Sequence, residues 1–254
     1  MTREAYCFVR TFTPEPAREL RVGRHYLLCA SAGALRLEAQ GRSWLLPPAR
    51  AALIEAGRPI QVSIPQPVTT ASVLFDTAFT PAPPAPLTVF DLSPLARTLV
   101  GECSPWGESD EPLSAYPATL FTALAAVTWR LAEQPSPVVV PAGTSPELRR
   151  ALHLTELRLA GDLRFDEIAA EVGFAPRSLA RRFEEEVGMT WRAVLRRMRI
   201  IRAIEELAAG EAPITEIAFT VGYTSLSAFN AAFRELTGRT PTAYRASFRA
   251  GSRD

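Results

Sequence analysis

A repeated eight-residue segment near the end of the sequence constrains the fold more than any other feature. Residues 167–174 read EIAAEVGF and residues 216–223 read EIAFTVGY, so both match E-I-A-x-x-V-G-[F/Y] at a spacing of about fifty residues. The match continues downstream through three corresponding pairs: Leu179 and Phe229, Phe183 and Phe233, and Gly188 and Gly238. Two copies of one pattern predict two copies of one structural unit.

Each copy has the residues that a helix-turn-helix needs. The small side chains of Ala169 and Ala218 allow two helices to cross closely, and Gly173 and Gly222 can adopt the positive φ of a tight helix exit. The apolar residues before and after the turn predict a wedge-shaped core that holds the helices at a steep angle. An amphipathic helix over residues 191–209 is predicted to join the two copies.

Residues from about 145 to 249 resemble the DNA-binding domain of the AraC/XylS family of bacterial transcription regulators. The resemblance covers both repeats, GMTWR at 188–192 with Arg199 after it, GYTSLSAFN at 222–230 and GRTPTAYR at 238–245. It implies an all-α, homeodomain-like domain with one helix-turn-helix at about 166–187 and another at about 215–236. Ala231 departs from the pattern, since many members have a long polar or basic residue there. We therefore expect the second helix-turn-helix to contact fewer bases.

By this resemblance, the outward positions of each second helix are those that contact bases. Leu179, Phe183, Phe229 and Phe233 are expected to point inward. The candidates for base contacts are Arg177, Ser178, Arg181, Ser225, Ser227 and Asn230. Arginine matches the acceptor pair of guanine, and asparagine matches the edge of adenine. The alternative is a solvated helix face on which Arg177 and Arg181 pair with the acids at 184–186.

Four further arginines are candidates for contacts to DNA phosphates: Arg182, Arg192, Arg196 and Arg239. For these four, ordinary surface arginine is the alternative. The net charge of the chain, +1, does not by itself indicate nucleic-acid binding; the placement of the arginines does.

The first ninety residues have a different sequence pattern, with short apolar stretches instead of helical periodicity. Short apolar stretches at 34–37, 43–46, 51–54, 60–64 and 71–75 alternate with turn residues, which predicts β-strands in a small barrel or sandwich. Helical periodicity follows at 93–100 and 116–132, a proline-rich stretch lies at 135–141, and a capped helix should begin at Ser145 and stop at Gly161. We therefore expect an α+β chain of two domains. Its parts are a barrel at 1–90, a helical extension and linker at 91–143, and the DNA-binding domain at 144–250.

Residues 27–62 resemble the cupin-like sensor barrel that precedes this DNA-binding domain in related regulators. The resemblance implies a small-molecule effector, and Tyr26, Arg36 and Trp44 are the candidates to line its pocket, although aromatic residues of a small barrel usually belong to the core. Metal-binding cupins use histidines of the barrel, whereas this sequence has only His25 and His153. We therefore expect no metal and no cofactor. His153 is expected on a helix, and a ligand role for His25 stays open.

Composition limits the class of protein. A chain of 254 residues with 47% hydrophobic and 22% charged residues is typical of soluble globular proteins. No apolar run approaches the ~18 residues of a membrane span, and the first ten residues lack the core of a signal peptide, so we expect a cytoplasmic protein with no membrane partner. Cys7, Cys29 and Cys103 follow no metal-ligand spacing, which favours reduced, partly buried thiols over a thiol or metal sensor.

Three classes of function fit these observations. The leading one is a regulator that binds double-stranded DNA and a small-molecule effector, forms a homodimer through its N-terminal domain, and contacts RNA polymerase if it is an activator. The second is a cupin-type oxygenase or isomerase with an accessory helical domain, against which the histidine count argues. The third, an interaction adaptor that does not bind DNA, leaves the outward arginines and Asn230 unexplained.

Overall fold

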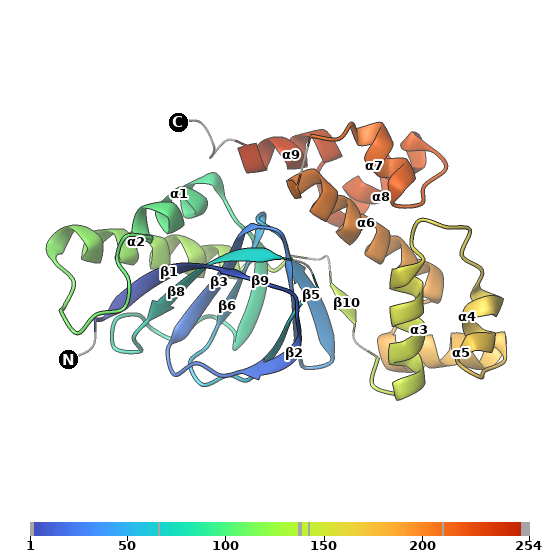
Figure 1. Cartoon of the computed structure of the whole chain (residues 1–254), viewed down its shortest axis with the longest axis horizontal. Helices are drawn as coiled ribbons and strands as arrows, with labels where there is room; N and C mark the ends of the chain where they lie inside the picture. The colour runs from blue at the N-terminus through green and yellow to red at the C-terminus, as the bar shows by residue number, and fades with distance from the viewer. Residues whose placement is uncertain (1–2, 66, 137–138, 142, 210, 250–254) are drawn as a thin grey trace. The chain divides into compact units, whose positions relative to one another are not determined.

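The structure is a computed structural model that describes residues 3–65, 67–136, 139–141, 143–209 and 211–249 (Figure 1). The chain clusters into two compact units, one made of residues 1–37, 45–136 and 245–254 and the other of residues 38–44 and 137–244. The predicted linker at 135–141 is covered only in part, because residues 137 and 138 lie outside the described residues, as does residue 250 of the predicted DNA-binding domain.

Two five-stranded sheets form the β part of the molecule. The first sheet has the order β1-β8-β3-β6-β9, and each neighbouring pair in it is antiparallel. Its strands are β1 (Ala5–Phe12), β8 (Val68–Phe75), β3 (His25–Ala32), β6 (Arg50–Ile54) and β9 (Leu87–Asp91). The second sheet has the order β10-β5-β4-β7-β2, with strands β10 (Val140–Pro141), β5 (Arg42–Leu46), β4 (Leu35–Ala39), β7 (Ile60–Ile64) and β2 (Glu15–Leu20).

The core of the first unit lies between the first sheet and two helices, α1 (Pro94–Cys103) and α2 (Ala115–Ala132) (Figure 1). Side chains alternate between the two faces of a strand, so Leu27 and its partner Val73, like Cys29 and Ala71, lie on the same face. These side chains pack with residues of both helices in one buried cluster that includes Val100, Phe121 and Leu124. The α+β fold class is thus confirmed.

The sequence-based prediction missed several strands, among them β1, β2, β3 and β9. The strand β2 is polar and largely exposed at the edge of its sheet, so it lacks an apolar signal. The strand β3 begins with six buried residues, and a strand covered on both faces shows no alternation.

The second unit is built mainly from helices. They are α3 (Pro146–Leu157), α4 (Phe165–Glu171), α5 (Pro176–Arg182) with its π-helical continuation η1 (Phe183–Val187), α6 (Trp191–Ala209), α7 (Ile214–Thr220) and α8 (Leu226–Thr237); α9 (Pro241–Arg249) follows. The Ser145 hydroxyl caps α3 as predicted by accepting from Leu148 N, but α3 ends at Leu157, before the predicted stop at Gly161. The predicted connecting helix at 191–209 is confirmed as α6.

In the described part of the chain, no helix combines the length and the apolar character needed to cross a membrane.

Candidate nucleic-acid interface

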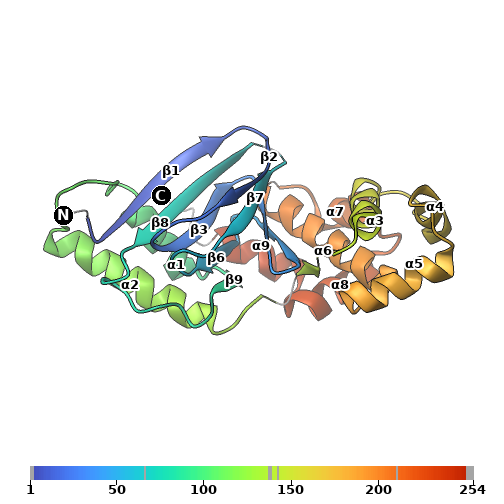
Figure 2. The same ribbon diagram turned by 90° about the horizontal axis from the view of Figure 1, so that it is seen from below.

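The two repeats fold as two helix-turn-helix motifs, α4–α5 and α7–α8, with α6 between them (Figure 2). The side chains expected to form the wedge are buried in both: Leu179 and Phe183 in the first, and Phe229 and Phe233 in the second. The alanines that let the helices cross, Ala169 and Ala218, are fully buried as well. The same residue types thus hold each pair of helices together.

The turns of the two motifs share a glycine with positive φ and the same backbone hydrogen bond, although the second turn is one residue longer. Gly173 has a φ of 77° and Gly222 a φ of 91°, which confirms the positive φ predicted for both. The next residue in each motif donates back across the turn, Phe174 N to Ala169 O at 2.9 Å and Tyr223 N to Ala218 O at 3.0 Å. This pattern satisfies carbonyls at the end of the first helix and fixes where the second helix begins.

On α5, the candidates for base contacts differ in exposure. Arg177 and Arg181 are exposed, whereas Ser178 is half-buried. The Arg181 guanidinium lies 3.5 Å from the Glu185 carboxylate, with 74% and 61% of the two side chains exposed. The alternative of a helix face paired with the acids thus describes Arg181 in the structure, but such an exposed pair is worth little and can be exchanged.

On α8, Ser227 and Asn230 are exposed, while Ser225 has a structural role. The Ser225 hydroxyl accepts a hydrogen bond from Ala228 N at 3.4 Å and caps the helix. The Ser225 hydroxyl therefore stabilises the start of α8, in addition to any contact with DNA.

The four candidates for phosphate contacts fall into two pairs. Arg182 lies over the Phe174 ring at 4.9 Å and donates to Glu186, and Arg196 donates to Glu235 of α8. Arg192 and Arg239 are exposed. Within the described residues, no side-chain contact is present for the guanidinium groups of Arg192 and Arg239.

A carboxylate that the sequence analysis missed anchors α3 to the end of the first motif. Glu186 in η1 accepts four hydrogen bonds of 2.6–3.0 Å from the backbone N–H and the hydroxyl groups of Thr144 and Ser145. Burial alone would raise the pKa of Glu186, but these hydrogen bonds and the one from Arg182 lower it to about 2. Nothing in the local sequence could reveal this contact, because its partners lie more than forty residues away.

Arg199 of α6 is a second residue whose role was missed, and it connects the segment that follows α3 to the second motif. Its Nε donates to Leu159 O at 3.1 Å, and its guanidinium lies 5.8 Å from the centre of the Tyr223 ring, directly after Gly222. Burial lowers the pKa of Arg199 from its usual value. The sequence singled out Arg199 only as part of the family resemblance, without a role.

The candidates for an effector pocket, Tyr26 and Arg36 in the first unit and Trp44 in the second, are mostly core residues. Tyr26 and Trp44 are buried, and Arg36 is half-buried. The Tyr26 hydroxyl shares a hydrogen bond of 2.8 Å with Ser72 Oγ, and burial raises the pKa of Tyr26 to about 12. A polar pair that satisfies itself in this way stabilises the core and leaves less capacity for a ligand.

The remaining titratable groups of interest are buried too. His25 accepts a hydrogen bond from Ala56 N at its Nδ1, 3.1 Å away, and burial lowers the pKa of His25, which favours the neutral ring that this hydrogen bond requires. Burial raises the pKa of Cys7 and Cys103 to about 12, and that of Cys29 as well, so these thiols stay protonated. The described residues contain no group of three or more His, Cys, Asp or Glu side chains that could hold a metal ion.

Comparison with known proteins links the second unit to characterised regulators. A family model described as a helix-turn-helix domain matches residues 168–247. The regulatory protein PocR of Salmonella typhimurium is 30% identical over 105 residues, which cover 41% of this chain and 35% of PocR. The chain thus spans only about a third of the length of this relative.

Two further matches extend the comparison. The transcriptional regulator NimR of Escherichia coli is 26% identical over 239 residues, covering 90% of this chain and 81% of NimR. The solved C-terminal domain of AraT, a response regulator from Geobacillus stearothermophilus, is 33% identical over 41% of this chain and 86% of its own, with a TM-score of 0.39. The matched residues include both turns, the connecting helix α6 and the two wedge cores, so residues 168–247 form a paired helix-turn-helix domain of the AraC type.

Proposed function

We propose that this protein is a transcription regulator that binds a specific double-stranded DNA sequence through both helix-turn-helix motifs. The observation that carries the proposal is the pair of similar helix-turn-helix turns, one on either side of a single helix. At 1.5 Å per residue, the 19 residues of α6 span about 28 Å. This length is close to the ~34 Å between successive major grooves on one side of the duplex.

The exposed faces of α5 and α8 provide suitable chemistry for base contacts. Arg177 and Arg181 on α5 offer forked donors for guanine, and Asn230 on α8 offers a donor and an acceptor for adenine. The short hydroxyl side chains of Ser178, Ser225 and Ser227 would contact bases or phosphates that lie close to the helices. The Arg181–Glu185 pair is exposed, so DNA can replace the glutamate with little loss of free energy.

Phosphate contacts would fix the register of the motifs on the duplex. Arg192 and Arg239 are exposed and can reach a phosphate without breaking a described side-chain contact. Arg182 and Arg196 would have to exchange Glu186 and Glu235 for phosphate. We therefore expect Arg192 and Arg239 to contribute more to the salt dependence of binding than Arg182 and Arg196.

The first unit would supply the regulation. The relatives that match the chain are regulatory proteins, which supports a binding role over an enzymatic one. We propose that a small-molecule effector binds this unit, that the unit forms a homodimer, and that an activating form contacts RNA polymerase. A regulator of this kind acts in the cytoplasm.

The test is a binding titration on the duplex that the protein selects from random sequence. Arg181→Ala should weaken binding to this duplex by about 1–3 kcal/mol and relax the preference at one or two base pairs, and Asn230→Ala should do so more weakly. Arg130→Ala, which removes the same charge from an exposed position on α2, is the control and should bind as the original chain does. Protection of a single major groove in a footprint, or equal loss on selected and scrambled duplexes, would contradict the proposal.

A further inference from the structure

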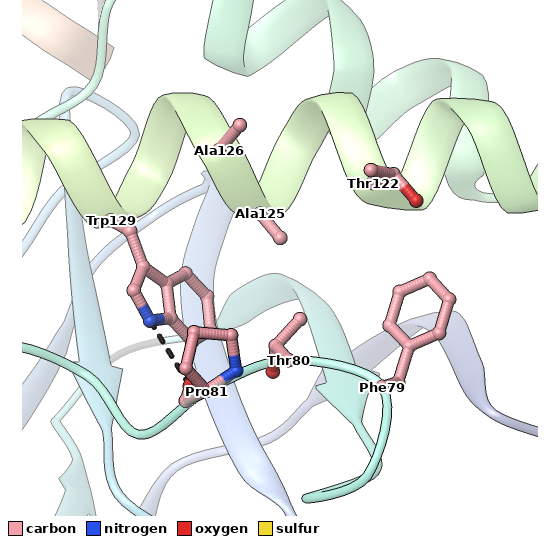
Figure 3. Close-up of a pocket in the computed structure, with 7 residues that line it drawn as sticks. All are labelled: Phe79, Thr80, Pro81, Thr122, Ala125, Ala126 and Trp129. Carbon is pink, nitrogen blue, oxygen red and sulfur yellow. Dashed lines mark hydrogen bonds between the residues drawn. The ribbon is translucent and has the colours of Figure 1, made fainter.

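A cavity of about 260 Å³ lies in the first unit between helix α2 and the loop that follows β8 (Figure 3). Its lining residues come from the loop (Phe79, Thr80 and Pro81) and from α2 (Thr122, Ala125, Ala126 and Trp129). The Trp129 indole N–H holds the two walls together by donating to Pro81 O at 3.2 Å and Ala82 O at 3.3 Å. These hydrogen bonds hold α2 and the loop together at the cavity.

The lining selects a neutral ligand. Not one of the seven lining residues is charged, and a charged group that enters such a site loses hydration without gaining a partner. The rings of Phe79 and Trp129 stand at two sides of the space, with the small side chain of Ala125 between them on the helix (Figure 3). Flat aromatic rings are well accommodated between such side chains, because offset stacked and edge-to-face contacts are both favourable.

A single polar group of the lining lacks a partner. Thr80 is 6% exposed, and its Oγ1 makes no hydrogen bond to any described residue. A buried hydroxyl without a partner is unfavourable and calls for an explanation. A rotation about χ1 exchanges the methyl and hydroxyl groups between staggered positions, so the hydroxyl can turn to a ligand group when the cavity is filled.

The size of the cavity limits the ligand to about one ring with a substituent. An engineered apolar cavity of ~150 Å³ binds benzene, and this cavity is larger by a margin that leaves room for a few more heavy atoms. Full drug-sized ligands occupy pockets of ~300–1,000 Å³ and would not fit.

The cavity is connected to the sheet by aromatic contacts. Trp129 meets Phe75 of β8 edge-to-face at 5.5 Å and His25 of β3 at 6.2 Å, and Phe75 stacks with Phe79 at 6.4 Å. A ligand that shifts Trp129 or Phe79 therefore acts directly on residues packed against the first sheet.

We propose that this cavity binds a neutral, single-ring aromatic compound with one hydroxyl or carbonyl group, its ring between Phe79 and Trp129 and its polar group at the Thr80 hydroxyl. This places the ligand beside α2, and the predicted candidates Tyr26, Arg36 and Trp44 are not among the residues that line the cavity. The binding site stands on its own observations, and only its role as the effector site rests on the proposed function.

The first test is calorimetric titration of the full chain with phenol, toluene and benzoate. Phenol should bind with a stoichiometry of one, toluene more weakly, and benzoate, which is charged, not measurably. Thr80→Val should weaken phenol binding by about tenfold and leave toluene unchanged, since it removes only the hydroxyl. Failure of phenol to bind saturably, or binding of benzoate as tight as that of phenol, would overturn the proposal.

A matched pair of variants on α2 tests the location. Thr122 and Thr119 are both exposed, and their hydroxyls donate to the carbonyl four residues earlier, Ala118 O and Ala115 O. Only Thr122 lines the cavity. Thr122→Leu should therefore weaken phenol binding by at least about tenfold, whereas Thr119→Leu should not change it. Equal effects would place the ligand elsewhere and overturn the proposal.

The two proposals fail separately. Phenol binding is measured without DNA, and DNA binding is measured without phenol, so a loss of either leaves the other intact. A third titration, of the selected duplex in the presence of saturating phenol, tests the regulatory role: an altered affinity supports it, and an unchanged affinity removes the effector role while the ligand site remains.

Discussion

Gly173 and Gly222 occupy the same position in the two repeats, yet alanine should affect them differently. Both have positive φ, which an L side chain rarely adopts. An added Cβ at Gly173 would meet no atom within 4 Å. At Gly222 it would collide with the carbonyl oxygen of Leu159 and lie 2.8 Å from Nη2 of Arg199. Both substitutions therefore force alanine into a positive φ, and only Gly222→Ala also creates a steric clash.

The magnitudes follow from these contacts. The left-handed conformation costs alanine about 1–2 kcal/mol, which is the whole expected loss for Gly173→Ala. At Gly222 the new methyl group must displace both the Leu159 backbone and the Arg199 side chain that donates to it, and overpacking of this kind costs a further ~1–3 kcal/mol. Gly222→Ala should thus destabilise its motif by about 2–5 kcal/mol, a substantial part of the ~5–15 kcal/mol that stabilises a typical protein.

Hydrogen–deuterium exchange resolved by segment measures the two losses in the full chain, where a single unfolding transition need not apply. Gly173→Ala should raise exchange modestly in α4 and α5. Gly222→Ala should raise it strongly in α7 and α8 and also around Leu159, because the collision lies there. Equal effects of the two variants, or unchanged exchange around Leu159, would refute the argument that close packing against Leu159 distinguishes the two glycines.

Two further substitutions test the contacts that the sequence did not reveal. Glu186→Gln should lower the free energy of unfolding, measured with denaturant, by about 2 kcal/mol. Glu184→Gln, at an exposed position of the same segment, should lower it by less than ~0.5 kcal/mol. Because the pKa of Glu186 falls from 4.5 to about 2, the stability it contributes is present above pH 4.5 and is lost as the pH falls through about 2; unfolding curves of Glu186→Gln and the original chain that stay equally far apart down to that pH would contradict this. Arg199→Lys should weaken binding to a duplex with both half-sites by about tenfold more than binding to one half-site, since lysine lacks the planar guanidinium that contacts Leu159 and the Tyr223 ring. The control is Arg202→Lys on the same helix, which should leave this ratio unchanged because Arg202 pairs with Glu205 and Glu206.

The paired motifs were predictable because their information is local. A helix-turn-helix is specified within about twenty residues by a small residue, a glycine and apolar residues at helical spacing. Gly173, Gly222, Leu179 and Phe229 could therefore be assigned a positive φ or a buried position from the sequence alone, and the structure confirms these assignments. The repetition at a fixed spacing raised the pattern above chance.

The contacts that connect the elements were not predictable, because they join residues distant in sequence. Glu186 looked like one of three acids on a solvated helix face, yet its carboxylate gathers the donors of Thr144 and Ser145. The strand β3 was missed for a related reason, since the burial of Leu27 and Cys29 on one of its faces depends on helices that come much later in the chain. Periodicity reports the surroundings of a segment only where one face stays in water.

The two motifs are alike in their cores and unlike on their outer faces, and this asymmetry shapes how the proposed interface would read DNA. In the repeat alignment Arg177 corresponds to Ser227, and Arg181 corresponds to Ala231. The first motif thus offers two guanidinium groups, whereas the second offers Asn230 and short side chains. The helix α6 contacts both motifs: Trp191 and Val194 share a buried cluster with Leu179 of the first, and Arg196 donates to Glu235 of the second. Because the two motifs are held by the same helix and differ in their outward side chains, we expect the first motif to make more of the base contacts than the second.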